Sequence, residues 1–434
     1  MLISFSVENW MSFRNRATLS MVASKEKQHQ ERLTRIPNSK MRLSPVSAMY
    51  GANASGKSNF CKALAFMQEL VVKGNALNAP IKVAPFVFDR LCRERPSFFQ
   101  IAILVGEKCY EFGFSATRSG VVEEWLTEFI GTKERQLYKR DATGVSGECV
   151  ETSERMRFIA EGTRKNQLFL TNTIDQNAEE FKHIHSWFKN TLRVITPDSH
   201  FLHFLDTEEK VSLYELVGQY LKELDTGIER LEWREQKIDS LGFPKEVAAE
   251  MEALADGEQM VLSTSSGDEL YLFKESQKLV AKRLRAAHKD ITGDTHYFPM
   301  VEESDGSRRL VDLLPAFLSL FYEDAPRVYF VDEFDRSLHT LLTRHLLQNY
   351  LHQCGEATRA QFLFTTHDVL LMDQHILRRD EMWITERMED GGTTLTSFGE
   401  FKDIRYDKDI RRSYLQGRLG GIPHILFWET VHED

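Results

Sequence analysis

Residues 46–58 read Val46-Ser-Ala-Met-Tyr50-Gly51-Ala-Asn53-Ala-Ser55-Gly56-Lys57-Ser58, a short apolar run followed by a glycine-rich loop. The loop fills every fixed position of the phosphate-binding P-loop pattern, G-x-x-x-x-G-K-[S/T]. After the loop, apolar residues recur at helical spacing as far as Val71. The segment is therefore predicted to form a buried strand, a loop and a helix, which is the context that the pattern requires.

Each fixed position of this loop has a chemical reason. The glycines let backbone N–H groups point inward at the positive end of the following helix, where a phosphate binds. Lys57 is expected to reach the β- and γ-phosphates, and the Ser58 hydroxyl to ligate Mg²⁺. The sequence has no Asn-Lys-x-Asp guanine motif, so we expect ATP with Mg²⁺. The predicted nucleotide-binding residues are Gly51, Asn53, Ser55, Gly56, Lys57 and Ser58.

A second apolar run, residues 327–331, predicts a buried strand that ends at Asp332-Glu333. An acidic residue at such a strand tip can hold the Mg²⁺ shell, which makes Asp332 a candidate metal ligand. A second carboxylate behind it can deprotonate the attacking water, which makes Glu333 the candidate general base. The two motifs lie about 270 residues apart, yet both must contact one nucleotide. The middle of the chain is therefore predicted to be an insertion.

Two further segments are candidates for contacts with phosphate. Ser304-Asp-Gly306-Ser307 precedes an amphipathic helix at 310–322, whose N-terminus can bind an anion. The same residues could equally be a simple N-cap. A buried strand at 361–365 leads to His367, which is in the position expected for a γ-phosphate sensor.

The alternation of buried strands with helices predicts an α/β fold with a largely parallel core sheet. Residues 85–140 alternate as an antiparallel β meander, 178–232 are rich in helix patterns, and 233–300 mix strands with a helix at 244–255. We predict three segments. They are 1–175, the N-terminal half of an ATPase core with a β lobe; 176–300, a helical or mixed insertion; and 301–434, the C-terminal half of the core.

Taken together, these motifs resemble an ABC-type ATPase head. More narrowly, the chain resembles the SMC-like, OLD-type ATPases of bacterial anti-phage and abortive-infection operons. The resemblance rests on residues 5–13, Glu303-Ser-Asp-Gly-Ser-Arg-Arg309, Thr365-Thr-His-Asp368 and the closing stretch Tyr414-Leu-Gln-Gly-Arg-Leu-Gly-Gly-Ile-Pro423. The chain departs from the pattern in three ways. Thr340 replaces an expected proline, and the signature is Ser-Asp-Gly-Ser rather than Ser-Gly-Gly-Gln. The Q-loop glutamine has no clear position, and Gln100, before a predicted strand, is the candidate.

The resemblance implies roles and partners. Ser304, Gly306 and Ser307 would contact the γ-phosphate of a nucleotide held by an opposite subunit, in a head-to-head homodimer or higher homo-oligomer. Asp335 would be the D-loop acid, and His367 a catalytic switch histidine. A separate effector protein, a Toprim-like nuclease, and a phage-encoded trigger are implied partners. Only 67 residues follow His367, so we expect any nuclease to be another chain.

Composition limits the class of protein. The chain has 434 residues, 42% hydrophobic and 28% charged, as in ordinary globular proteins. A net charge of −10 opposes nonspecific nucleic-acid binding, although the basic cluster at 278–289 leaves a local contact open. No apolar run approaches the roughly 20 residues of a membrane span. The five cysteines form no CxxC pair, so we expect a cytoplasmic protein without a disulfide framework or a zinc site.

Three alternatives remain at this point. One is a nucleotide-gated scaffold that sequesters a toxic partner with little turnover, although such a scaffold need not keep Glu333. Another is an SMC-like DNA repair ATPase, which the acidic charge and the lack of coiled-coil heptads disfavour. A metal enzyme is also conceivable, and its candidate ligands are His183, His185, His200 and His203.

Overall fold

The computed structural model describes residues 1–37, 39–131, 133–197, 207–238, 243, 247, 251, 254, 259–263, 267–275, 278–322, 326–401 and 409–422. The chain forms two compact units. Unit 1 comprises Met1–Pro197, Asp324–Phe334 and Leu347–Asp434, and unit 2 comprises Asp198–Glu323 and Asp335–Leu346. The three predicted segments stay a prediction. Most of the predicted helix at 244–255, together with His200, His203 and Pro423, lies outside the described residues.

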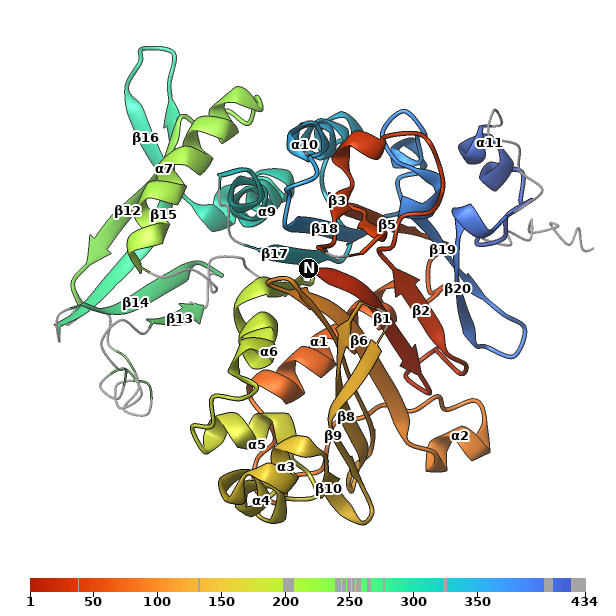
Figure 1. The fold of residues 1–434 in the computed structure, drawn as a ribbon. Coiled ribbons are helices and arrows are strands. Elements are labelled where there is room, and N and C mark those ends of the chain that lie inside the picture. The colour runs from red at the N-terminus through yellow and green to blue at the C-terminus, as the bar shows by residue number, and fades with distance from the viewer. Residues whose placement is uncertain are drawn as a thin grey trace, which may run out of the picture. The chain divides into compact units, whose positions relative to one another are not determined.

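The core sheet of unit 1 has six strands in the order β11-β17-β18-β5-β19-β20 (Figure 1). The strands from β11 to β19 run parallel, and β20 pairs antiparallel at the edge. Every residue of β5 and β18 is buried, because a parallel strand covered on both faces needs a continuous apolar run. The strands are β5 (Val46–Tyr50), β11 (Leu192–Ile195), β17 (Arg327–Val331), β18 (Ala360–Thr365), β19 (Met382–Arg387) and β20 (Thr393–Ser397).

A second sheet of unit 1 has seven antiparallel strands in the order β10-β9-β8-β7-β6-β1-β2. The predicted meander at 85–140 accounts for β6 to β9, and in β6 buried residues alternate with half-exposed ones over most of the strand. The strands are β1 (Leu2–Glu8), β2 (Ala17–Ser20), β6 (Ser97–Val105), β7 (Lys108–Thr117), β8 (Gly120–Ile130), β9 (Lys133–Asp141) and β10 (Gly144–Ser146).

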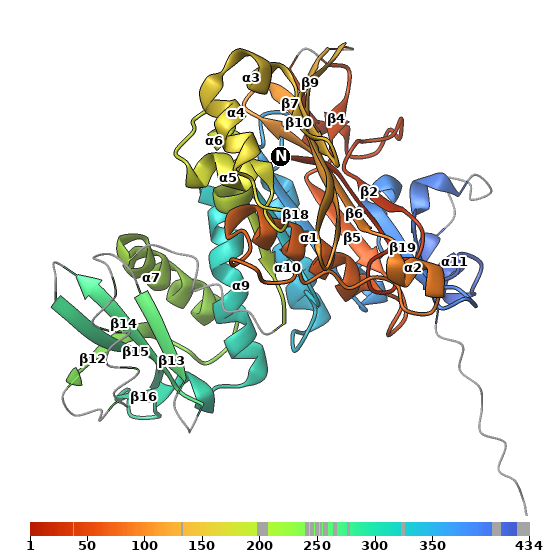
Figure 2. The ribbon, with the colours of Figure 1, turned by 90° about the horizontal axis from the view of Figure 1, so that it is seen from below.

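Helix α1 (Lys57–Val72) lies between the two sheets (Figures 1 and 2). Its Phe60 ring meets Phe5 of β1 at 5.2 Å and Phe330 of β17 at 6.4 Å between centroids. One apolar core therefore joins α1 to both sheets. Helix α10 (Thr340–Gln353) begins in unit 2 and ends in unit 1. The other described helices of unit 1 are short: α2 (Arg90–Glu94), α3 (Glu148–Thr152), α4 (Glu154–Glu161), α5 (Phe169–Asp175), α6 (Lys182–Ser186) and α11 (Ile410–Leu415).

The described residues of unit 2 include helices α7 and α9, the start of α10 and an antiparallel sheet (Figure 2). The sheet order is β12-β15-β14-β13, with β16 paired to β15. Helix α7 packs on β12 and α9, and the Trp233 ring lies against Tyr214 and Tyr271. The elements are α7 (Thr207–Glu223), β12 (Arg230–Gln236), β13 (Gln259–Ser263), β14 (Glu269–Glu275), β15 (Lys278–Lys289), β16 (Thr295–Pro299) and α9 (Asp305–Tyr322).

The predicted fold class is confirmed: the molecule is α/β, with a parallel-rich core sheet, antiparallel sheets and helices. Within unit 2, the antiparallel sheet is larger than the sequence patterns suggested. Strand β11 was not foreseen within the helix-rich stretch, because four residues, two of them half-exposed, give too short a pattern. None of the described helices is long and apolar enough to cross a membrane.

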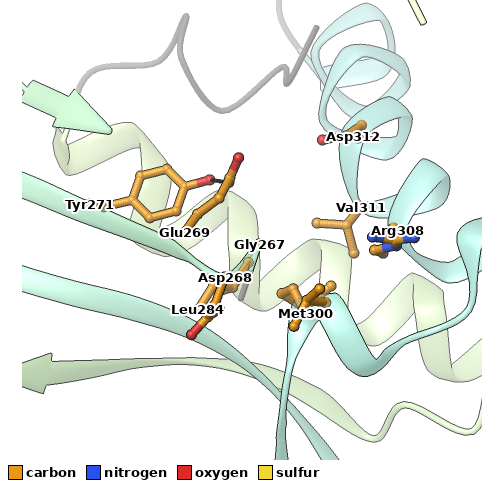
Figure 3. A pocket seen from close by; sticks show the side chains of 10 residues that line it. Gly267, Asp268, Glu269, Tyr271, Leu284, Met300, Arg308, Val311 and Asp312 are labelled. Carbon is orange, nitrogen blue, oxygen red and sulfur yellow. Dashed lines mark hydrogen bonds between the residues drawn. The ribbon is translucent and has the colours of Figure 1, made fainter. Parts of the chain in front are cut away.

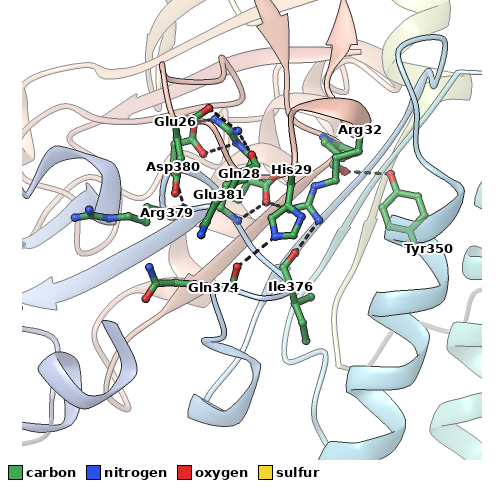
Figure 4. Close-up of polar contacts among 12 residues, drawn as sticks. Glu26, Gln28, His29, Arg32, Tyr350, Gln374, Ile376, Arg379, Asp380 and Glu381 are labelled. Carbon is green, nitrogen blue, oxygen red and sulfur yellow. Dashed lines mark hydrogen bonds and ion pairs between the residues drawn. The ribbon is translucent and has the colours of Figure 1, made fainter. Parts of the chain in front are cut away.

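A buried polar cluster joins residues 26–32 of unit 1 to residues 374–381 (Figure 4). Arg32 pairs with the fully buried Glu381 and donates to the carbonyl of Ile376 at 2.7 Å. Arg378, which has no exposed side-chain surface, pairs with Asp380 at 2.8 Å. The Arg32–Glu381 ion pair, together with hydrogen bonds from Arg378 to the carbonyls of Glu26 and Gln28, attaches residues 26–32 to the segment directly before β19.

Candidate functional site

The order of the core sheet brings three loops together. Strands β17, β18 and β5 are neighbours and run parallel, so their carboxyl ends lie at one edge of the sheet. The P-loop follows β5, the segment with His367 follows β18, and Asp332-Glu333 follow β17. Such an edge is where ligands bind in open α/β sheets.

At its two glycines, the P-loop backbone has positive φ angles, which favour glycine. Gly51 and Gly56 have φ of +151° and +107°. A Cβ on Gly51 would lie 2.4 Å from Thr385 Oγ1, and one on Gly56 would lie 2.5 Å from Thr393 Oγ1. Side chains therefore have no room at either position, and α1 begins directly after Gly56 with its N-terminus at the loop.

Lys57 lies over this loop. Its side chain is buried, and Nζ donates to the carbonyls of Gly51 at 2.8 Å and Ala52 at 3.1 Å. The same Nζ lies 3.5 Å from Nδ1 of His367. The candidate switch histidine is therefore beside the cation that is expected to meet the phosphates.

The two acidic residues after β17 are held by one hydroxyl. Thr365 Oγ1 donates to Asp332 Oδ1 at 2.6 Å and accepts the backbone N–H of Glu333 at 2.8 Å. Glu333 has a φ of +52°, a left-handed conformation that is uncommon for a residue other than glycine. The hydrogen bond from its N–H to Thr365 helps to hold this turn directly after β17.

The donor set at this edge fits a magnesium ion. The hydroxyl of Ser58 and the carboxylate of Asp332 are the oxygen ligands that Mg²⁺ takes. Asp332 also acts on the first turns of α1: burial, and then the charge of Asp332, raise the pKa of the Cys61 thiol well above its usual value. The charge of Asp332 therefore acts on Cys61, in the same helix as Ser58 and Lys57.

The predicted residues fall into two groups. The first, in unit 1, is brought together at the sheet edge; there Ser55 and Asp332 are buried, Ser58 is half-exposed and Asn53 is exposed. The members of this group are Gly51, Asn53, Ser55, Gly56, Lys57, Ser58, Asp332, Glu333 and His367. The second group, in unit 2, is described by itself: Ser304, Gly306, Ser307 and Asp335.

In unit 2 the signature residues form the start of α9. Ser304 caps the helix, since its Oγ accepts the N–H of Ser307 at 3.1 Å. The Ser304 side chain is nevertheless exposed. A Cβ on Gly306 would lie 2.9 Å from the carbonyl oxygen of Ser337, so a glycine lets α9 approach the segment that begins at Asp335.

Several supporting residues were missed by sequence reasoning. Thr385 Oγ1 lies 2.6 Å from Ser55 Oγ and donates to the carbonyl of Tyr50 at 3.1 Å. Thr393 Oγ1 donates to the carbonyl of Ser55 at 2.9 Å. Both threonines come from β19 and β20, more than 300 residues along the chain, and no local signal in the sequence marks them. Thr365 could have been suspected, because it ends a buried strand beside His367.

Two other features singled out in the sequence were the histidines of a possible metal site and the basic cluster at 278–289. Among the described residues, no cluster of three or more His, Cys, Asp or Glu side chains is arranged to hold a metal ion, so His183 and His185 are not part of one. In the basic cluster of β15, Arg283 and Arg285 both pair with Asp268 at 3.0 Å, and Lys289 pairs with Glu229. Part of this positive charge is therefore neutralised within unit 2.

A cavity of about 260 Å³ lies in unit 2 beside α9 (Figure 3). Leu284, Met300 and Val311 give it an apolar wall, and Glu269 and Asp312 give it acidic groups. The Tyr271 hydroxyl donates to Glu269, so one of these acids is already engaged. None of the residues predicted for the nucleotide site lines this cavity.

A family model described as "AAA domain, putative AbiEii toxin, Type IV TA system" matches residues 46–373. The chain belongs to this AAA-domain family. The match begins at β5 and ends six residues after His367. The matched region therefore includes all the predicted site residues of both units.

Other comparisons give more distant similarities. A search of curated protein sequences gives no match. Among solved structures, the chain is similar to the SMC head domain from Thermotoga maritima, with a TM-score of 0.34, 11% identity, and coverage of 91% of this chain and 98% of that one. It is also similar to the recombination mediator protein RecF with ATP, with a TM-score of 0.36, 13% identity, and coverage of 91% and 99%.

Proposed function

We propose that this protein binds and hydrolyses ATP at the carboxyl edge of β5, β18 and β17, as the ABC-type ATPase subunit of an anti-phage defence system. One observation carries the proposal. Hydrogen bonds connect three segments that are remote in sequence: Lys57 of the P-loop contacts His367, and Thr365 binds both Asp332 and Glu333. A phosphate-binding loop, a candidate metal ligand and a candidate base are the groups that phosphoryl transfer to water requires.

The chain's own residues supply the binding and the proton transfer. Backbone N–H groups of the P-loop and the start of α1 bind the phosphates, and Lys57 leaves the loop carbonyls to meet the β- and γ-phosphates. Glu333 orients the attacking water and accepts its proton. His367, beside Lys57, is placed to contact the γ-phosphate. Mg²⁺, held by Ser58 and Asp332, would neutralise charge on the phosphate oxygens.

A second copy of the chain completes the site in this proposal. Ser304, Gly306 and Ser307 lie at the first turn of α9, and the exposed Ser304 hydroxyl is accessible to another molecule. Small side chains at a helix N-terminus suit an anion such as the γ-phosphate. The active form would therefore be a head-to-head homodimer or a larger homo-oligomer, with Asp335 next to the shared site.

The defence role has a different kind of support. The description of the family names a toxin of a type IV toxin–antitoxin system. The signature and the closing stretch also resemble those of the OLD-type ATPases. In the proposed role, ATP turnover by this subunit regulates a separate effector, for which a nuclease is the first candidate, in response to a phage-encoded trigger. The placement of Glu333 favours turnover over a passive scaffold.

Complementation between two inactive variants tests the shared site. Lys57→Ala removes the phosphate-binding cation but keeps the signature, and Ser304→Arg blocks the signature but keeps the P-loop. Neither variant alone forms a complete site. In an equimolar mixture, about half of the dimers are mixed and each has one complete site of two, so roughly a quarter of the wild-type ATPase activity should return.

Ser119→Arg is the matched control, because it adds the same side chain at an exposed turn of the antiparallel sheet and should leave activity intact. Differently tagged subunits show by co-purification whether exchange has occurred. A mixture that exchanges subunits and stays as inactive as its components would refute the shared site.

A further inference from the structure

The segment that follows α11 reaches the P-loop directly. We call residues 416–422 the C-terminal brace. The carbonyl of Gly421 accepts the backbone N–H of Ala52, the second residue of the P-loop, at 2.8 Å. The same carbonyl accepts the Tyr414 hydroxyl at 2.9 Å. A segment more than 350 residues away in sequence therefore binds the loop on which nucleotide binding depends.

The end of β19 holds both partners of this contact. Thr385 packs against Gly51 and binds Ser55, as described above. Its neighbour Glu386 accepts the N–H of Gly421 at 3.2 Å. Successive side chains of a strand point to opposite faces, so one strand end can support the P-loop with one residue and the brace with the next.

The two adjacent glycines of the brace allow this close approach. Gly420 and Gly421 have φ of +73° and +68°, in the region that favours glycine. A Cβ on Gly420 would lie 2.5 Å from Glu386 Oε2, and one on Gly421 would lie 2.4 Å from Ile384 Cδ1. The brace therefore fits against β19 only because both side chains are missing.

The contact constrains the conformation of the P-loop. With its N–H bound to Gly421, Ala52 is oriented so that its own carbonyl and that of Gly51 face Lys57 Nζ. A loop that is held in one conformation loses less entropy when it binds a ligand. The hydrogen bonds of the brace join it to Ala52 of the P-loop and to Glu386 of β19, so the expected influence is on the binding of ATP.

We propose that the C-terminal brace positions the P-loop and thereby sets the affinity of the protein for ATP, with Glu386 as the positioning residue that anchors it. The inference rests on the proposed function, since it concerns the same nucleotide site. It also gives a route of regulation: any partner that displaces the brace would weaken nucleotide binding without touching the site itself.

The test compares variants of the full chain in ATP titration and steady-state hydrolysis. Glu386→Ala removes the acceptor of the Gly421 N–H, whereas Glu386→Gln keeps an acceptor oxygen at the same position. We expect Glu386→Ala to raise Kd and KM for ATP about tenfold, the scale of one lost hydrogen bond to a charged group, with kcat changed less than about twofold. Glu386→Gln should stay close to wild type.

Leu415→Ala is the control for the helix before the brace, because Leu415 is exposed and should tolerate truncation. If Glu386→Ala does not fold, Tyr414→Phe removes the other hydrogen bond at Gly421 and should raise Kd and KM in the same direction. A folded variant with lower thermal stability but wild-type Kd and KM would overturn the inference.

The proposed function can fail separately. Wild-type protein that binds ATP no better than Lys57→Ala would refute the P-loop assignment and the brace with it. Wild-type protein that binds ATP well, together with Glu386→Ala that binds equally well, would refute the brace alone.

Discussion

The hydroxyl of Thr365 is the smallest group on which the proposed chemistry depends. It donates to Asp332 and accepts from the N–H of Glu333, so one side chain fixes the metal-ligand candidate and the backbone of the base. The left-handed backbone of Glu333 makes this support important, because such a conformation has to be stabilised by its surroundings.

Thr365→Val tests this role at the level of a single hydroxyl. Valine keeps the shape but removes the hydroxyl that binds Asp332 Oδ1 and the Glu333 N–H. We expect kcat to fall about 10- to 100-fold, corresponding to roughly 1.4 to 2.7 kcal/mol, while Kd for ATP changes little. Thr365→Ser keeps the hydroxyl and should restore most of the rate. Equal kcat values for the Val variant and the wild type would show that this bridge has no catalytic role.

At the scale of single residues, the sequence predicts those site residues that stand in a short local motif. The P-loop residues and the two acids stand in short motifs, so they could be named in advance, and the structure places them at one sheet edge. Thr385 and Thr393 could not be named, because their role comes from a hairpin that folds back onto the loop from a distant part of the chain. Residues 414–423 resemble the closing stretch of the OLD-type ATPases, but the contact of this segment with the P-loop could not be predicted from the sequence.

Among the elements, the connection between residues 26–32 and 374–381 depends on buried charge (Figure 4). Burial raises the pKa of Glu381 to about 7, and the nearby Arg32 opposes this shift. Glu381 also accepts the N–H of Arg378 at 2.8 Å. The cluster therefore attaches the N-terminal loop to the core sheet through a carboxylate that burial makes more basic.

This shift predicts the pH dependence of stability. Between the unperturbed pKa of 4.5 and the folded value of about 7, the folded chain retains a proton that the unfolded chain releases. Rising pH then favours unfolding, and the loss should be on the order of 1 to 3 kcal/mol between pH 5 and 8. Urea unfolding at several pH values measures this slope.

The non-titrating Glu381→Gln should have a shallower slope than wild type, and Glu154→Gln, an exposed position at the start of α4, should keep the wild-type slope. If Glu381→Gln retained the full slope, another group would have to be responsible for the pH dependence.

The predictability of the elements follows from their burial. Strands β5, β17 and β18 are nearly continuous apolar runs, so their existence and type were evident in the sequence. Strand β11 is short and half-exposed and was missed, although it is an edge strand of the same sheet. The extent of the sheet in unit 2 also exceeded expectation, because its strands are rich in charged residues that weaken the alternating pattern.

At the scale of the whole molecule, three segments from distant parts of the sequence meet at one edge of the core sheet. Their meeting could be inferred from chemistry, since a P-loop and its acidic partner must contact the same nucleotide. The order of the strands could not be inferred, because residues 46–50 lie between strands that come from the C-terminal third. Sequence motifs thus named the residues of the candidate site, and the sheet order explains how those of unit 1 are brought together.

The most direct measurement is ATP binding and phosphate release on the same samples of wild-type protein and Glu333→Gln. Glutamine keeps the shape of the side chain but cannot accept the proton of the attacking water. We predict that the variant binds ATP about as tightly as wild type and that its rate of phosphate release is lower by a factor of about 100 or more. Phosphate release by Glu333→Gln at a rate close to that of wild type would contradict the assignment of this sheet edge as the hydrolytic site.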